Sequence, residues 1–246
     1  MEFSQCSQGC FDVTVGPVMD LWRSSREAVK PPEEAKLRQI LSLVNYHDLV
    51  FEPDKKAVSL KKAGQSLDLG GIGKGFTADK ILEICRTYNV TSAFTNLGGN
   101  VAAIGAKPDG SPWRIGIRHP RQDHNLIGVI SMINKSVVTA GDYQRCFIGS
   151  NGKRYHHILD PQTGYPAELE LISVTVAAES SLAADALSTI LFTTLFTTGM
   201  KTGLELLKSF PGTEAIFIDI NLKVYVTQGL QACFQTCDGI KMNILN

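Results

Sequence analysis

The chain has 246 residues, enough for one substantial hydrophobic core, and we expect a single domain over residues 1–246. Lysine plus arginine and aspartate plus glutamate number 24 each, so no net field attracts nucleic acid or an anionic membrane. No apolar run approaches the roughly 20 residues that span a bilayer, and no basic and apolar signal segment opens the chain. The sequence therefore predicts a cytoplasmic protein without a nucleic-acid partner or a membrane span.

The six cysteines are too scattered for a disulfide scaffold, which is typical of a reducing compartment. Two pairs have a three-residue gap that zinc tolerates, Cys6 with Cys10 and Cys233 with Cys237. No histidine lies at matching spacing, and buried reduced cysteine is the more common state. We therefore favour free thiols over structural zinc.

The first half of the chain predicts two helices and a hairpin. Apolar residues at helical spacing follow two prolines and two acids over residues 31–44. Residues 57–61 and 66–69 read as strands joined by a turn that carries glycine. A glycine-rich segment, residues 70–75, then leads into a predicted helix over 76–88.

The rest of the chain is mostly strand. Short β-rich runs cover residues 93–95, 101–104, 113–117, 127–132 and 137–138, and consecutive short strands favour antiparallel pairing. A strand over 171–177 precedes a helix over 180–207 with an interruption near Gly199, and strands over 215–220 and 222–227 follow. The fold class is α+β, with a mixed or antiparallel sheet and helices packed on it.

The glycine-rich segment is the first candidate for chemistry. Four glycines in six residues let backbone N–H groups approach a phosphate, and the following helix directs its positive end there. Lys74 adds a charge, and Asp68 can accept from a ribose or ring N–H. A tight turn with a solvated lysine explains the same residues, and the spacing matches neither the Walker nor the Rossmann pattern.

Two further segments carry polar residues between strands. Residues 96–100, Asn-Leu-Gly-Gly-Asn, are typical of a bulge or of a close backbone approach to a ligand. His156 and His157 point to opposite faces if they lie on a strand, so one of them can face a site and act as a general base. A hydrogen-bonded structural histidine is the alternative.

The fourth candidate lies near the start of the long helix. Asp185 and Thr189 are four residues apart and share a helix face, so carboxylate and hydroxyl oxygens converge. Such oxygen ligands suit magnesium or calcium better than zinc. An acid that merely complements the helix dipole is the alternative.

Taken in order, these segments resemble the ApbE family of FAD-dependent FMN transferases. The match begins at residues 11–17, Phe-Asp-Val-Thr-Val-Gly-Pro, with Leu21 and Trp22 behind them, and ends at residues 185–189. The resemblance implies Mg²⁺-dependent transfer of FMN from FAD to a threonine or serine hydroxyl of a flavoprotein, with release of AMP. Phosphoryl-type transfer depends mainly on positioning and charge neutralisation, which agrees with this chemistry.

The resemblance also implies roles for individual residues. His157 and Asp185 would be catalytic. The metal would be held by Gly71, through its carbonyl, and by Asp185, Ser188 and Thr189. Flavin-nucleotide contacts would come from Cys10, Phe11, Asp12, Asp68, Lys74 and Leu159.

The chain departs from the family at its start, where only ten residues precede Phe11. Members usually carry a further segment there that helps enclose the flavin, so we expect the chain to be truncated relative to the family. Two alternatives stay open: a flavin-binding module of a larger redox protein without catalysis, and an FAD pyrophosphatase that yields FMN and AMP.

Overall fold

A computed structural model describes residues 1–167, 170–237 and 239–245, and gives the backbone alone for residues 195–200. The chain divides into two compact units. The smaller unit comprises Met1–Leu69 and Gln144–Glu168, and the larger comprises Gly70–Tyr143 and Leu169–Asn246. Of the helices in the described residues, none is long and apolar enough to cross a lipid bilayer.

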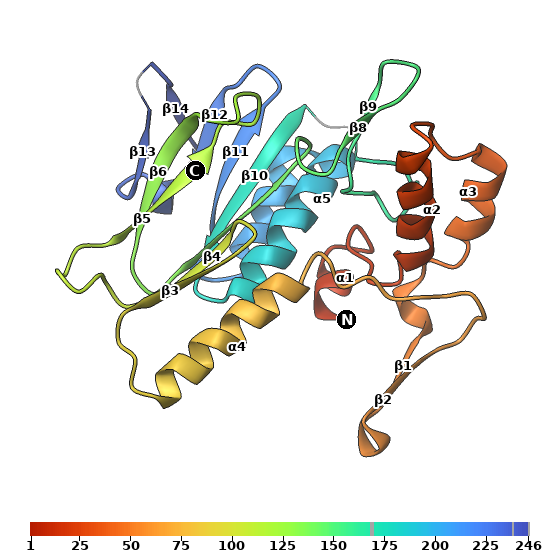
Figure 1. Cartoon of the computed structure of the whole chain (residues 1–246), viewed down its shortest axis with the longest axis horizontal. Helices are drawn as coiled ribbons and strands as arrows, with labels where there is room; N and C mark the ends of the chain where they lie inside the picture. The colour runs from red at the N-terminus through yellow and green to blue at the C-terminus, as the bar shows by residue number, and fades with distance from the viewer. Residues whose placement is uncertain (168–169, 238, 246) are drawn as a thin grey trace. The chain divides into compact units, whose positions relative to one another are not determined.

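The smaller unit is mainly helical. It contains α1 (Glu2–Cys6), α2 (Gly16–Glu27) and α3 (Glu34–Leu41), coloured red to orange in Figure 1. Helix α2 was not predicted; it begins with Gly16 and Pro17, and proline fits the first helical turn because its missing N–H has no partner there. Trp22 anchors this unit, since its indole donates to the carbonyl of Gly164 at 2.7 Å and its ring packs on Tyr155.

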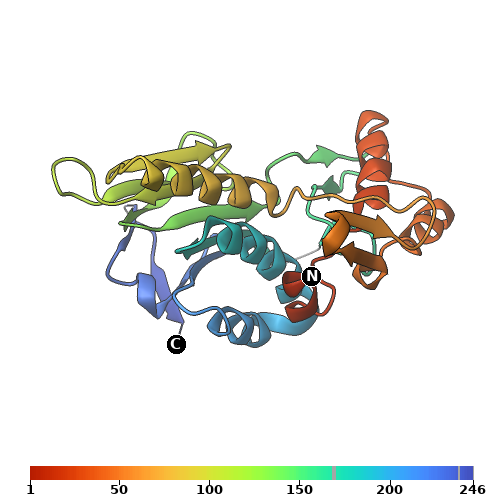
Figure 2. The same cartoon turned by 90° about the horizontal axis from the view of Figure 1, so that it is seen from below.

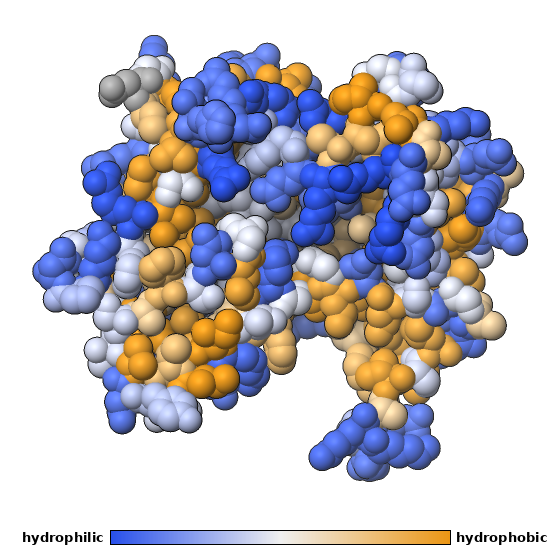
Figure 3. Space-filling model, in the orientation of Figure 1, coloured by the Kyte–Doolittle hydropathy of each residue, from blue (hydrophilic) through white to orange (hydrophobic). Residues whose placement is uncertain are grey.

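Two hairpins complete the smaller unit. Strand β1 (Leu49–Glu52) pairs with β2 (Ala57–Leu60), and β8 (Phe147–Ile148) with β9 (Arg154–Tyr155). The predicted hairpin was therefore wrong in its partner: the strand at 57 turns back on residues 49–52, and residues 66–69 form no strand. Figure 3 shows a hydrophilic tip on the β1–β2 hairpin. Phe51 of β1 and Val58 of β2 are exposed apolar residues.

The larger unit is built on a seven-stranded sheet in the order β14-β12-β11-β10-β7-β4-β3. Its neighbours are antiparallel except for β12 and β14, which are parallel. The strands are β3 (Ala93–Leu97), β4 (Asn100–Ile104), β7 (Ser136–Gly141), β10 (Leu171–Ala178), β11 (Glu214–Asp219), β12 (Val224–Thr227) and β14 (Met242–Leu245). The predicted mixed sheet is thus confirmed.

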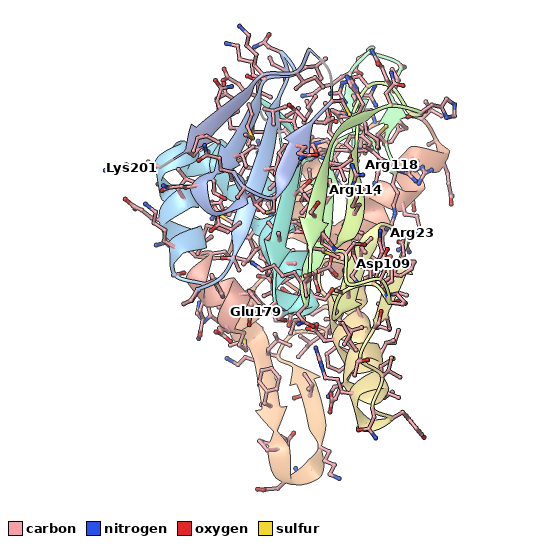
Figure 4. The ribbon with its side chains drawn as sticks, turned by 90° about the vertical axis from the view of Figure 1, so that its left-hand side faces the viewer. Arg23, Asp109, Arg114, Arg118, Glu179 and Lys201 are labelled. Carbon is pink, nitrogen blue, oxygen red and sulfur yellow. The ribbon has the colours of Figure 1, made fainter. Side chains whose placement is uncertain are left out.

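A smaller sheet covers one face of the large one. It contains β5 (Trp113–Arg118), β6 (Leu126–Met132) and β13 (Phe234–Thr236). Buried aliphatic side chains from both sheets form one cluster, with Val101 and Ala103 of β4 among them. Arg114 and Arg118 lie on β5 with exposed side chains (Figure 4), as the alternation along a strand predicts.

Two helices pack on the large sheet. Helix α4 (Gly73–Thr87) places Ala78 and Leu82 on Ala102 and Ile104, which alternate with the residues of the other cluster. Helix α5 (Ser181–Lys208) packs on α4 and on β4, β7 and β10. Figures 1 and 2 show α4 and the first half of α5 side by side. Helix α5 is continuous through the interruption predicted near residue 199.

Candidate functional site

The glycine-rich segment and the aspartate of the long helix meet in the larger unit. The carboxylate of Asp185 accepts a hydrogen bond at 2.8 Å from the backbone N–H of Gly75, and the ammonium of Lys74 lies 3.4 Å from its other oxygen. The same ammonium donates to the carbonyl of Gly70 at 3.3 Å. A buried carboxylate and a loop carbonyl therefore share one cation, supplied by the chain itself.

Asp185 is buried, with only 4% of its side chain exposed, whereas 37% of the Lys74 side chain is exposed. A buried carboxylate requires hydrogen bonds and a positive partner, and Gly75 and Lys74 supply them. The contact is reached from positions 110 residues apart in the chain. This hydrogen bond forms because the N-terminal turns of α4 and α5 lie next to each other.

Helix α4 begins earlier than predicted, at Gly73, so the loop itself is limited to residues 70–72. Gly75 and Gly73 differ in the space around them. A Cβ on Gly75 would lie 2.3 Å from the carbonyl oxygen of Ser181, whereas a Cβ on Gly73 would meet nothing within 4 Å. Gly75 is therefore needed for the close approach of α5, and Gly73 leaves open space beside the loop.

The predicted hydroxyl ligands follow Asp185 on α5. Ser188 is buried and its hydroxyl donates to the carbonyl of Asp185 at 2.9 Å, which leaves the oxygen as an acceptor. Thr189 is half-buried, one helical turn after Asp185. Gly71 is half-buried in the loop next to Gly70. In the described part of the chain, no three histidine, cysteine or acidic side chains cluster as metal ligands would.

Asp79, which the sequence did not single out, and Asn100 hold the start of α5. The carboxylate of Asp79 on α4 accepts from the Ser180 hydroxyl and from the backbone N–H groups of Ser181 and Leu182, at 2.7 to 3.0 Å. The Ser181 hydroxyl donates to the side-chain carbonyl of Asn100 at 2.8 Å. Asn100 belongs to the segment that was predicted to form a bulge or a ligand contact.

The two adjacent histidines have different surroundings in the smaller unit. His156 is buried: one ring nitrogen bonds to the carbonyl of Ala167 at 2.9 Å, and the other accepts from the N–H of Ile158 at 3.3 Å. His157 is half-buried, and its Nδ1 lies 3.0 Å from the carbonyl of Gln144. A carbonyl only accepts, so Nδ1 carries the proton and Nε2 is the basic nitrogen of His157.

The other predicted flavin contacts in the smaller unit are largely buried. Cys10, Phe11 and Leu159 are each less than a tenth exposed. Asp12 is buried too, and its carboxylate accepts from the N–H and hydroxyl of Thr14 and from the N–H of Tyr46. Asp68 is half-buried, and its N–H donates to the carbonyl of Val13 at 2.8 Å. Asp12 thus shapes the backbone beside Phe11.

The chain is similar to known transferases. A relative from Klebsiella pneumoniae is 35% identical over 96% of this chain, and one from Treponema pallidum is 35% identical over 93%. Both are named FAD:protein FMN transferase, so the predicted enzyme class, a transferase, is confirmed. The chain spans 72% of the first relative and 66% of the second.

The family follows from the same comparisons. The ApbE family model matches residues 1–217. The crystal structure of the ApbE protein from Thermotoga maritima is 33% identical and superposes with a TM-score of 0.86, covering 94% of this chain and 74% of that one. The apo flavinyl transferase ApbE of Pseudomonas stutzeri superposes with a TM-score of 0.74 at 30% identity. The chain belongs to the ApbE family, and the predicted α+β fold is confirmed.

Proposed function

We propose that this chain transfers FMN from FAD to a threonine or serine hydroxyl of an acceptor flavoprotein, with Mg²⁺ at the pyrophosphate and AMP as the leaving group. Its relatives carry the name of this activity, and its family membership supports the same reaction. The observation that carries the proposal is the shared cation position between the glycine loop and Asp185. A dinucleotide pyrophosphate needs positive charge and backbone donors at one place, and this loop offers both.

The residues at this position fit Mg²⁺. The carbonyl of Gly70, which precedes Gly71, and the Asp185 carboxylate already face one positive charge, and the hydroxyls of Ser188 and Thr189 follow on the same helix as Asp185. Mg²⁺ prefers such oxygen donors and is commonly bound by one or two carboxylates together with substrate phosphates. We assign Gly71, Asp185, Ser188 and Thr189 as its protein ligands. When bound, the ion would neutralise the pyrophosphate charge.

Lys74 would also take part in the transfer. Its ammonium lies between the carbonyl of Gly70 and the carboxylate of Asp185, and Gly70 directly precedes Gly71, whose carbonyl would hold the ion. Its long, flexible side chain would let the ammonium reach a phosphate oxygen instead of Asp185. Lys74 would then stabilise negative charge on the phosphates during transfer.

The transfer exchanges a phosphoanhydride bond of FAD for a phosphoester bond to the acceptor. The acceptor oxygen attacks the phosphorus of the FMN half, the bond from that phosphorus to the bridging oxygen breaks, and AMP leaves with that oxygen. Nε2 of His157 would take the hydroxyl proton, since Nδ1 is held by the Gln144 carbonyl. His157 and Asp185 belong to different units, so their joint role rests on family membership.

We also propose Cys10, Phe11, Asp12, Asp68, Lys74 and Leu159 as flavin-nucleotide contacts. Cys10, Phe11 and Leu159 are apolar and held in place by burial, and the small part of each that stays exposed would contact an isoalloxazine ring. Because the Asp12 carboxylate is used by its own chain, its contribution would come through the backbone that it holds. Asp68 would accept from a ribose or ring N–H.

The test is direct. The protein is incubated with FAD, Mg²⁺ and a flavoprotein that bears a threonine acceptor, and covalent flavin fluorescence is read on a denaturing gel. We expect a fluorescent acceptor band that disappears with EDTA. Chromatography of a reaction without acceptor separates the alternatives: FMN and AMP would indicate a pyrophosphatase, and bound, intact FAD without any transfer would indicate a binding module.

A further inference from the structure

In each of the two helices at the site, backbone N–H groups of the first turn donate to a carboxylate of the other helix. Asp185 of α5 accepts from the N–H of Gly75, in the first turn of α4, whose own N-cap residue Ile72 makes no side-chain cap. Asp79 of α4 accepts from the N–H groups of Ser181 and Leu182, in the first turn of α5. The contacts are reciprocal, and each satisfies backbone donors that a helix leaves without an internal partner.

We propose that Asp79 is a positioning residue for Asp185 and thereby sets the cation affinity of the site. The proposal rests on the cation role assigned to Asp185 above. Asp79 is half-exposed on α4, and its three hydrogen bonds all go to the residues that open α5. Asp185 follows one helical turn later, so the position of that first turn fixes where its carboxylate lies.

A second contact supports the same turn from the sheet. The Ser181 hydroxyl donates to Asn100, a fully buried residue at the start of β4. The first residue of α5 is thus held from α4 by its backbone N–H and from β4 by its side chain. The carboxylate of Asp79 makes more of these bonds than Asn100, and it also complements the positive end of a 28-residue helix.

Replacing Asp79 by Asn tests this role, because the amide keeps the shape but exchanges one acceptor oxygen for a donor that faces backbone N–H groups. Glu83→Gln is the matched control: Glu83 lies on the same helix, is exposed, and pairs only with Lys80 among the ion pairs of the described residues. Mn²⁺ serves as the spectroscopic probe of the site, and free Mn²⁺ is measured by electron paramagnetic resonance with and without FAD.

Asp79→Asn should weaken Mn²⁺ binding about 10-fold, as substitutions behind metal ligands commonly do. The Mg²⁺ concentration for half-maximal transfer should rise by a similar factor, and saturating Mg²⁺ should restore the rate to within about threefold. Glu83→Gln should change neither value. Unchanged Mn²⁺ binding in a folded Asp79→Asn protein would overturn the proposal, and so would a rate that Mg²⁺ does not restore.

If Asp79→Asn does not fold, Ser180→Ala replaces it: this change removes one of the three partners of Asp79 and also the cap that the Ser180 hydroxyl gives the N–H of Ala183, so both contacts at the first turn of α5 are weakened together. A shift of about two- to threefold in the same direction is expected, and no shift contradicts the role. The measurement of Mn²⁺ binding does not depend on FMN transfer. A wild-type protein that binds Mn²⁺ without transferring FMN refutes the transferase proposal alone, whereas one that does not bind Mn²⁺ refutes the positioning role as well.

Discussion

Gly75 of α4 and Ser181 of α5 approach each other so closely that a Cβ on Gly75 would lie 2.3 Å from the Ser181 carbonyl oxygen and 2.7 Å from the Cα of Leu182. Both obstacles are backbone atoms, which cannot rotate away. The first turns of the two helices must therefore separate if any side chain is placed at residue 75. The hydrogen bond from Gly75 to Asp185 depends on the same approach.

Gly75→Ala should destabilise the protein by about 1–3 kcal/mol, although alanine is the better helix former, because the clash outweighs the gain in propensity. Urea denaturation measures the change. Gly73→Ala is the matched control: it lies in the same turn, and its Cβ would meet nothing within 4 Å. That variant should gain up to about 1 kcal/mol. Equal effects of the two substitutions would contradict the close approach.

Asp185→Asn should lower FMN transfer by about 100-fold or more, since the site loses its buried negative charge toward the cation. The amide oxygen can still accept from Gly75, so the free energy of unfolding should change by less than about 1.5 kcal/mol. Transfer assays and urea denaturation on the same preparation separate the two effects. A variant with full activity would exclude Asp185 as a metal ligand.

Lys74→Gln should affect activity and stability differently. The Lys74 side chain is 37% exposed and its ammonium lies 3.4 Å from Asp185, so the ion pair contributes less than about 1 kcal/mol to folding. Transfer should fall about 10-fold or more if the ammonium stabilises charge on the phosphates. The Mg²⁺ requirement should fall, because the competing cation is gone. A raised Mg²⁺ requirement would show that Lys74 does not occupy the position of the ion.

The sequence was sufficient for most of the larger unit, because its strands alternate or are wholly apolar and its helices have clear apolar faces. It misplaced one hairpin partner. The predicted turn contained Gly64, whereas the observed turn places Lys56, a residue with no glycine signal, at a left-handed φ of 50°. The sequence also missed α2, whose N-cap residue Val15 offers no capping side chain.

The sequence named candidate site residues, but it did not reveal the hydrogen bonds that position them. The motif residues Lys74 and Asp185 could be chosen from glycine content and from oxygen donors on a helix. Asp79 could not, because an acid in the middle of a helix is usually solvated, and its partners lie 101 to 103 residues away. Only the packing of α4 on α5 gives that carboxylate its role.

Tyr143 makes stability dependent on pH in the alkaline range. Burial raises the pKa of its phenol above the ordinary value of 10.0. The folded chain keeps the proton where the unfolded chain loses it, so this contribution is complete below pH 10 and is lost as the pH rises toward the folded pKa. Tyr143→Phe should flatten the fall in stability above about pH 10. Tyr88→Phe, at a residue 78% exposed, should keep the wild-type slope.

The adjacent histidines should separate catalysis from folding. His157→Ala should lower FMN transfer about 100-fold or more through loss of the proton acceptor, with little change in stability, because one hydrogen bond to the Gln144 carbonyl is removed from a half-buried side chain. His156→Ala should destabilise the protein by about 2–3 kcal/mol, since it leaves the buried Ala167 carbonyl and the Ile158 N–H without their partners. Urea denaturation and single-turnover transfer, measured on both variants and on His157→Gln, test the assignment. Activity lost by His156→Ala alone, at full folding, would transfer the catalytic role to the buried histidine.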